Sequence, residues 1–216
     1  MNQHNPSALK HAMRQCGLIA ILRSVRPDEV VAIGKVLYAA GFRVIEVPLN
    51  SPEPLTSIRA LRQTLPADCL LGAGTVLRAQ SCHDVAQAGG QLIVMPHSDP
   101  VVIRAAKAAG MACAPGVATA TEAFAALAAG ADVLKVFPAE TVGEVGIKAW
   151  CAVLPPDVVL VPVGGIVPER IAAYQAAGAR GFGLGSALYR PGSSVSEVAQ
   201  NAQVFVAAWY QAYPVA

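Results

Sequence analysis

Glycines and prolines divide the chain into short units of nearly constant length. Ala-rich stretches run through a glycine into a short apolar run, as in YAAGFRVIEV, KAAGMACAPG and LAAGADVLKV. A glycine directly after a helix adopts the left-handed conformation that ends it, and the apolar run that follows is typical of a strand. Such markers stand 20 to 25 residues apart, at Gly41, Pro66, Gly89, Gly110, Gly130, Pro155 and Gly178. The chain therefore repeats a unit of one strand and one helix.

This repeat predicts the fold. Strands are expected at residues 18–23, 43–48, 70–74, 91–95, 111–114, 132–137, 158–163 and 181–185. Helices are expected near 27–40, 53–64, 79–88, 99–109, 119–129, 143–153, 168–177 and 195–212. The alternation predicts an α/β protein, a single (β/α)8 TIM barrel domain over residues 1–216 with a short N-terminal helix. An open doubly wound sheet is the alternative, but the first strand has no G-x-G-x-x-G and no long substrate domain follows.

Composition excludes several classes of protein. Hydrophobic residues make up 54% of the 216 and charged residues 14%, yet no run of about 18 apolar residues predicts a membrane span. The first residues contain no apolar segment of a secretory signal, so we expect a cytoplasmic protein. A net charge of +2 from scattered lysines and arginines argues against a nucleic-acid partner. The four histidines lack H-x-H or H-x-x-x-H spacing, so no metal site is predicted.

A lysine interrupts one of the apolar strands. Lys135 stands in ADVLKVFPAE, near the carboxyl end of the strand at 132–137, where a barrel of this kind carries its chemistry. Side chains alternate along a strand, so Lys135 points into the barrel if Leu134 and Val136 pack on the helices. A buried ammonium either pairs with an anion or loses its proton as its pKa falls. The neutral amine is the form that attacks a carbonyl to make a Schiff base, and a structural ion pair is the alternative.

Three further side chains are expected at the same end of the barrel. Glu46, in RVIEVPLN, supplies a carboxylate that can move protons, as carbon–carbon cleavage beside a carbonyl requires. Arg23 ends the first strand, next to the last strand of a closed barrel, and is expected to bind a phosphate or carboxylate, or to form a salt bridge at the rim. Thr75, in GAGTV, either donates a hydrogen bond to a substrate carboxylate or is a turn residue.

Two glycine-rich loops follow the last two strands. Gly164 and Gly165 end PVGG, and Gly185 and Ser186 end GLGS. Loops of this kind expose backbone N–H groups to anions, and phosphate sites in such barrels lie after strands 7 and 8. We therefore expect a phosphate site here, with simple tight turns as the alternative.

The motifs AILR, IEVPLNSP, GAGTV, LKVFPAE, VGGI and GLGSALYR, in this order from about residue 17 to 213, resemble the 2-keto-3-deoxy-6-phosphogluconate and 2-keto-3-deoxy-6-phosphogalactonate aldolases. The resemblance implies a homotrimeric class I aldolase without cofactor or metal. It splits a phosphorylated 2-keto-3-deoxy sugar acid into pyruvate and glyceraldehyde 3-phosphate. By position, Lys135 matches the Schiff-base lysine and Glu46 the general acid/base. Substrate-binding positions match Arg23 and Thr75, and the phosphate site matches Gly164, Gly165, Gly185 and Ser186.

Single positions at which the two kinds of aldolase differ indicate which epimer the substrate is. Asn50 and Val163 stand where the gluconate enzymes often have arginine and threonine, which favours the galactonate type. FPAE at 137–140 is closer to the gluconate pattern, and Met95 and His97 depart from both. The substrates differ at one carbon, so dual activity is an alternative. From a different class, a phosphosugar isomerase with Glu46 as base, or a metabolite-binding barrel without turnover, would need no Schiff base.

Overall fold

The computed structural model describes residues 7–214; residues 1–6, which entered the argument about a secretory signal, lie outside the described residues. The strands are β1 (Leu18–Ile21), β2 (Val44–Pro48), β3 (Leu70–Gly74), β4 (Leu92–Val94), β5 (Ala112–Ala114), β6 (Gly116–Val117), β7 (Leu134–Val136), β8 (Leu160–Pro162) and β9 (Phe182–Leu184). The helices are α1 (Ser7–Gln15), α2 (Pro27–Ala40), α3 (Pro54–Thr64), α4 (Ala79–Gln87), α5 (Pro100–Ala108), α6 (Ala120–Ala128), α7 (Ala139–Cys151), α8 (Ile171–Ala177) and α9 (Val195–Ala212), with a 3₁₀ turn at Pro168–Arg170. Within residues 7–214, no helix has both the length and the apolar character needed to cross a membrane.

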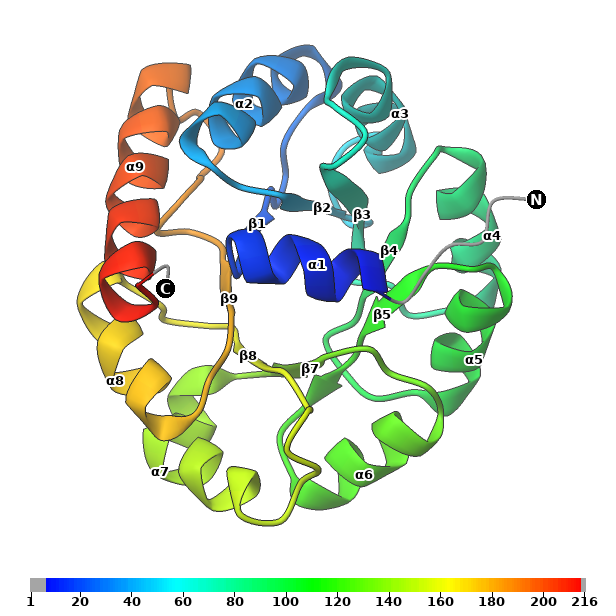
Figure 1. The fold of residues 1–216 in the computed structure, drawn as a ribbon. Coiled ribbons are helices and arrows are strands. Elements are labelled where there is room, and N and C mark those ends of the chain that lie inside the picture. The colour runs from blue at the N-terminus through cyan, green and yellow to red at the C-terminus, as the bar shows by residue number, and fades with distance from the viewer. Residues whose placement is uncertain (1–6, 215–216) are drawn as a thin grey trace.

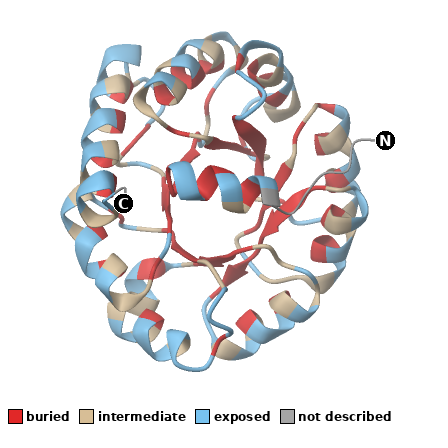
Figure 2. Ribbon diagram, viewed as in Figure 1, coloured by how far each residue is buried: buried red, intermediate tan, exposed pale blue. Residues whose placement is uncertain are grey.

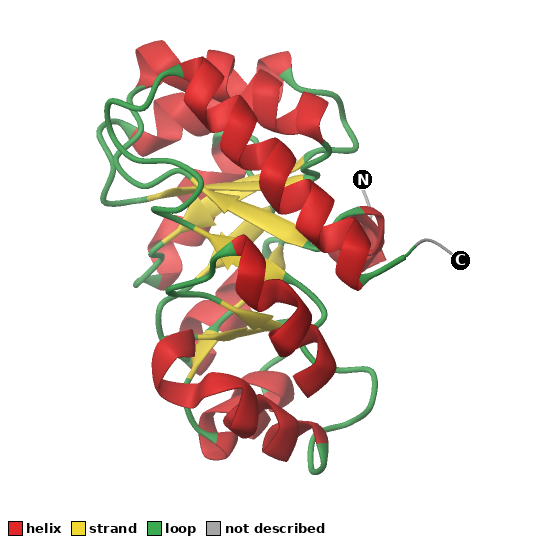
Figure 3. Ribbon diagram, turned by 90° about the vertical axis from the view of Figure 1, so that its left-hand side faces the viewer, coloured by secondary structure: helices red, strands yellow, loops and turns green. Residues whose placement is uncertain are grey.

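The strands form two parallel sheets around a common axis. One sheet has the order β5-β4-β3-β2-β1-β9 and the other β6-β7-β8. A single bridge between Val163 and Gly183 connects the region after β8 to β9, and only Pro115 separates β5 from β6. Figure 1 shows the strands around the centre of the molecule and helices α2 to α9 outside them. The same arrangement from the side shows the strands enclosed between helices (Figure 3).

The glycine markers end helices as the sequence predicts. Gly41, at the end of α2, has φ 121°, and its N–H donates to the Tyr38 carbonyl at 3.1 Å. Gly178 ends α8 with φ 111°. Only glycine adopts such angles without strain, so the chain leaves each helix and enters the next strand at once.

Two boundaries differ from the expectation. The fifth strand region, expected as one strand over 111–114, is followed after Pro115 by the short β6, because a proline has no N–H to give to a ladder. The helix expected near 143–153 begins at Ala139, directly after Pro138. Gly143 (φ 63°, ψ 178°) breaks its regular geometry, which divides α7 into a first turn and a longer second part.

The apolar core has two clusters of buried side chains, an inner and an outer layer. The strands that carry them are buried, as Figure 2 shows. Ile19 and Ile21 of β1 belong to the inner layer, whereas Leu18 and Ala20 pack towards the helices. The inner layer continues into α1 through Leu9, Ala12 and Met13, which are all buried. Figure 1 shows α1 lying across the ring of strands, so this helix covers the end at which the strands begin. The opposite end, where the strands finish, holds the polar residues described next.

Candidate active site at the carboxyl ends of the strands

Lys135 lies in the middle of β7, between Gly116 of β6 and Val161 of β8. Its neighbours Leu134 and Val136 belong to the helix-facing layer, so Lys135 points to the interior, as strand alternation predicts. The side chain is only 6% exposed. Its Nζ lies 4.6 Å from the centroid of the Phe137 ring. Burial lowers the pKa of Lys135, the Arg23 charge lowers it further, and the Glu46 charge opposes both. The surroundings therefore favour the neutral, nucleophilic amine.

Glu46 is the second buried ionisable group of the site. It lies on β2 beside Ile21 and Gly72, and only 1% of it is exposed. Burial raises its pKa from 4.5 to about 7, against the opposing charges of Lys135 and Arg23. A carboxyl group with this pKa both gives and takes protons near neutral pH.

Glu46 and Lys135 act on each other without direct contact. The ion pairs within 4.0 Å in residues 7–214 do not include these two groups. The Oε2 atom of Glu46 is buried and has no hydrogen-bond partner in the described part of the chain. A buried carboxyl oxygen without a partner is costly, so a substrate hydroxyl or a water that donates to it is favoured there.

Gly74 makes room for the Glu46 carboxyl group. A Cβ atom added at Gly74 would collide with the Glu46 carboxylate, so any larger residue at the end of β3 would displace it. Sequence reasoning quoted GAGTV for Thr75 and missed Gly74, because a contact between neighbouring strands leaves no mark on local periodicity. Thr75 itself follows β3 with φ 53°, a strained angle for a threonine.

A cavity of about 300 Å³ opens at the carboxyl ends of the strands. Six of the predicted site residues line it: Arg23, Lys135, Gly164, Gly165, Gly185 and Ser186. Thr75 is not among the described residues that line it. Glu46 is likewise not among the described residues that line it, but the charges of Lys135 and Arg23, which do line it, act on Glu46. The Arg23 Nη1 atom donates to the Asn50 Oδ1 atom at 3.1 Å, which fixes the arginine at the rim.

The two glycine loops form one wall of this cavity. Gly164 and Gly165 have φ values of 111° and 59°, which suit glycine alone. Their backbone also packs against the Glu140 side chain, because a Cβ atom at Gly165 would lie 2.7 Å from Glu140 Oε1. Gly185 is open, with no atom within 4 Å of an added Cβ.

Among the other residues that line the cavity, Phe137 and Arg190 were not predicted as site residues from the sequence. The alternation of side chains that places Lys135 inside also places Phe137 on the same face, so this signal was available. Arg190 ends the motif GLGSALYR, but the motif alone does not show which way a loop arginine points.

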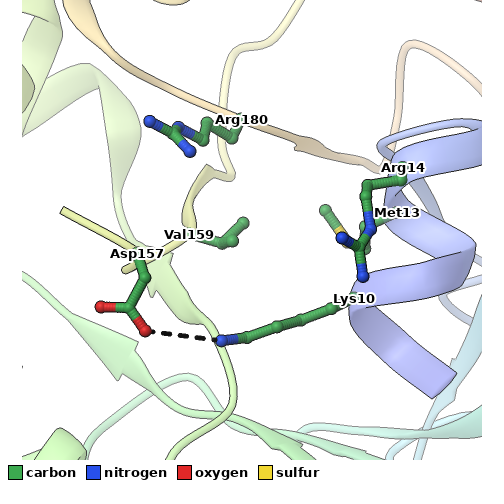
Figure 4. A pocket seen from close by; sticks show the side chains of 6 residues that line it. All are labelled: Lys10, Met13, Arg14, Asp157, Val159 and Arg180. Atoms are coloured by element: carbon green, nitrogen blue, oxygen red, sulfur yellow. Dashed lines mark ion pairs between the residues drawn. The ribbon is translucent and has the colours of Figure 1, made fainter. Parts of the chain in front are cut away.

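A second cavity, of about 340 Å³, lies at the opposite end, beside α1 (Figure 4). It is lined by Lys10, Met13, Arg14, Asp157, Val159 and Arg180. Lys10 Nζ and Asp157 Oδ2 are 3.9 Å apart, and the Asp157 side chain is 80% exposed. Within residues 7–214, the buried acid and amine, Glu46 and Lys135, lie at the other end, where the strands finish.

Comparison with known sequences finds a family model and relatives that match most of the chain. The family model described as "KDPG and KHG aldolase" matches residues 9–203. The probable 2-dehydro-3-deoxy-6-phosphogalactonate aldolase of Rhizobium meliloti (strain 1021) is 48% identical over 196 residues, 91% of this chain and 92% of that protein. The 2-dehydro-3-deoxy-6-phosphogalactonate aldolase of Escherichia coli (strain K12) is 49% identical over 195 residues, 90% of this chain and 95% of that protein.

Solved structures agree with this. A structure titled "Native KDPGal structure" has a TM-score of 0.90 and 48% identity, over 92% of this chain and 96% of that one. KDPG aldolase from Legionella pneumophila has a TM-score of 0.80 and 26% identity, over 96% and 98% of the two chains. In that structure pyruvate is captured as a covalent carbinolamine intermediate.

Proposed function

The chain belongs to the family of KDPG and KHG aldolases and is therefore a carbon–carbon lyase, and from this premise we propose that it is a class I aldolase of 2-dehydro-3-deoxy-6-phosphogalactonate. Its products are pyruvate and D-glyceraldehyde 3-phosphate. The observation that carries the proposal is the pair of buried groups at the carboxyl ends of the strands. Burial shifts the pKa of Lys135 down and that of Glu46 up to about 7, so a neutral amine and a carboxyl group that exchanges protons face one substrate.

In the first stage Lys135 forms a covalent bond to the substrate. The neutral amine attacks the C2 carbonyl and gives a carbinolamine. Glu46, in its protonated form, gives a proton to the C2 hydroxyl, which leaves as water. The product is an iminium, in which the positive nitrogen attracts electrons from C3. The carbinolamine captured in the Legionella pneumophila relative supports this stage.

In the second stage the carbon–carbon bond breaks. Glu46, now a carboxylate, takes the proton of the C4 hydroxyl, and the C3–C4 bonding electrons move into the iminium. Glyceraldehyde 3-phosphate leaves, and an enamine remains on Lys135. Glu46 returns its proton to C3, and water then hydrolyses the iminium to pyruvate and the neutral amine. The proton released in the hydrolysis goes back to the Glu46 carboxylate, so the cycle closes. The orphaned Oε2 of Glu46 is available for these transfers.

Binding of the substrate is shared among the remaining predicted residues. We propose that Arg23 and Thr75 bind the sugar acid, and that the backbone N–H groups around Gly164, Gly165 and Gly185, with Ser186, bind its phosphate. Five of these six residues, all but Thr75, line the cavity, and Arg23 donates a hydrogen bond to Asn50.

The galactonate epimer is favoured by two side chains and by the names of two relatives. Asn50 contacts Arg23 at the rim, and Val163 lines the cavity. The second candidate is the gluconate epimer, or activity on both, which the FPAE motif at 137–140 favours because it is closer to the gluconate pattern. Comparing kcat/KM for the two sugar acids decides between the epimers.

The architecture of the enzyme completes the proposal. We propose one domain over residues 1–216 and a closed (β/α)8 barrel, in which β5 and β6 form a single strand interrupted at Pro115. Hydrogen bonds from Met95 N to the Ala114 carbonyl and from Lys135 N to the Pro115 carbonyl support this continuity. The homotrimer, the cytoplasmic location and the absence of a cofactor or metal stay predictions.

The mechanism is tested by trapping the Schiff base. The protein is incubated with pyruvate, reduced with borohydride, digested and analysed by mass spectrometry. We expect an adduct on the peptide that contains Lys135, and none in Lys135→Arg. A folded protein that forms no adduct with excess pyruvate would favour the isomerase, in which Lys135 serves only as a charge.

A further inference from the structure

We propose that Arg190 recognises the substrate phosphate and so gives the site its preference for phosphorylated over unphosphorylated sugar acids. This inference rests on the proposed function and assigns a charge to its phosphate subsite. Arg190 lines the same cavity as Lys135, and it shares the wall formed by Gly185 and Ser186.

The loop around Arg190 is well fixed. The Arg190 Nε atom donates to the Ser186 carbonyl at 2.9 Å. The N–H groups of Leu188 and Tyr189 both donate to the Gly185 carbonyl, at 2.9 and 3.0 Å. The Tyr189 hydroxyl donates to Glu29 Oε1 at 3.0 Å, which ties the loop to α2. The guanidinium is thus held at the edge of the cavity before any ligand binds.

The remaining atoms of the guanidinium are free for a ligand. Among residues 7–214, the Nη1 and Nη2 atoms of Arg190 have neither a hydrogen-bond partner nor an ion-pair partner. A planar guanidinium matches two oxygens of a phosphate, which makes paired hydrogen bonds possible.

The glycine loops need such a cation. Their backbone N–H groups and the Ser186 hydroxyl are neutral donors, and the Glu140 carboxylate packs against Gly164 and Gly165 from outside the cavity. A doubly charged phosphate placed on these loops would therefore face an uncompensated negative charge. Arg190 supplies the opposite charge on the cavity side.

The two other cations of the cavity belong to its reacting end. Arg23 donates to Asn50, and its charge acts on both Glu46 and Lys135. Arg190 lies on the loop after β9, bonded to Ser186, whereas Lys135 lies on β7 and Arg23 follows β1. A substrate with a 2-keto acid at one end and a phosphate at the other fits this separation of charges.

The experiment compares kcat/KM for the phosphorylated sugar acid with kcat/KM for the same acid without phosphate. In Arg190→Gln we expect the ratio to fall about tenfold, since the arginine is exposed to solvent and its charge is partly screened. Arg190→Lys keeps the charge and should lose no more than about threefold. Arg104→Gln, an exposed arginine of α5 away from the cavity, is the matched control and should keep the ratio.

Two results would overturn the inference. An unchanged ratio in Arg190→Gln would mean that the phosphate is bound without this side chain. An equal fall in Arg190→Gln and Arg190→Lys would mean that only the bond to the Ser186 carbonyl counts, and not the charge.

Binding of inorganic phosphate by calorimetry separates this inference from the proposed function. We expect weaker phosphate binding in Arg190→Gln than in the wild type and the Arg104→Gln control. That result, in a protein that forms no pyruvate adduct, would keep Arg190 as a phosphate residue and reject the aldolase. A pyruvate adduct in all variants, with phosphate binding unchanged, would keep the aldolase and reject the role of Arg190.

Discussion

Lys135 and Glu46 lie at the carboxyl end of an apolar interior that favours the neutral form of each. Burial lowers the pKa of Lys135 and raises the pKa of Glu46, and the charge of each group limits the pKa shift of the other. Bulk water would stabilise the charged forms, and both side chains are almost fully buried. The chemistry at this site is therefore set by burial first and by the neighbouring charges second.

The raised pKa of Glu46 predicts a change of stability with pH. Between about pH 4.5 and pH 7 the folded protein keeps a proton that the unfolded chain has lost, so the free energy of unfolding falls as pH rises through this window. The loss is roughly 3 kcal/mol at most. Glu46→Gln should remove this slope, as measured by urea unfolding at pH 5 and pH 7. Glu169→Gln, at an exposed glutamate, should keep it, and a slope that survives in Glu46→Gln would contradict the assignment.

Gly74 gives a second prediction at this scale. Gly74→Ala should displace the Glu46 carboxyl group, because the added methyl group takes its place. We expect kcat to fall at least about tenfold, as for a loss of general acid/base catalysis, while pyruvate still forms the adduct on Lys135, but more slowly than in the wild type. Stopped-flow or coupled assays measure kcat, and trapping measures the adduct. Wild-type kcat in Gly74→Ala would mean that Glu46 has room to move.

Sequence reasoning predicted that Lys135 and Glu46 lie on the inner face of their strands, because period-2 alternation fixes the face of a strand residue once its neighbours are known. It missed Gly74 and Arg190 for a different reason. The contact of Gly74 with Glu46 joins two strands, and the direction of Arg190 depends on a loop held by Tyr189 and Glu29. Neither this contact nor the direction of the Arg190 side chain leaves a local pattern in the sequence.

Helix and strand boundaries were predictable where glycine or proline dictates the backbone. Gly41 and Gly178 end their helices at the expected residues. The start of α7 was not predictable, because Ala139 begins a helical turn that Gly143 then interrupts. A break within a helix and a loop that precedes a helix contain the same types of residue, so the sequence does not separate the two cases.

The start of α6 predicts a local loss of stability. Thr119 Oγ1 accepts a hydrogen bond from Glu122 N at 3.2 Å, and Glu122 Oε2 accepts one from Thr119 N at 2.9 Å. Thr119→Ala should lower the free energy of unfolding by about 1 kcal/mol, since it leaves a helix N–H without its partner. Urea unfolding measures this, and kcat should not change. A loss well above that size would mean that Thr119 does more than cap this helix.

The whole molecule is predicted to be a trimer. Leu77, Val101 and Phe124 come from consecutive β/α units and are 53%, 58% and 47% exposed. Exposed apolar side chains of this size favour contact with another chain. Light scattering should give three times the 22.2 kDa of one chain. Val101→Asp with Phe124→Asp should reduce this mass.

A matched variant tests that surface. Val145, on α7, is 85% exposed and comes from a different part of the ring of helices (Figure 1). Val145→Asp should leave the mass of the assembly unchanged. A wild-type mass of a single chain would contradict the trimer, and dissociation by Val145→Asp alone would place the contact elsewhere.

Helix α1 affects the order in which the products of the proposed reaction leave the site. Its buried residues Leu9, Ala12 and Met13 close the end at which the strands begin, so within residues 7–214 the interior opens at the carboxyl ends. Pyruvate is held by a covalent bond to Lys135, while the phosphorylated aldehyde is free once the C3–C4 bond is broken. The aldehyde must therefore leave through the opening at the carboxyl ends before pyruvate does. The next sugar acid binds only after pyruvate has also left.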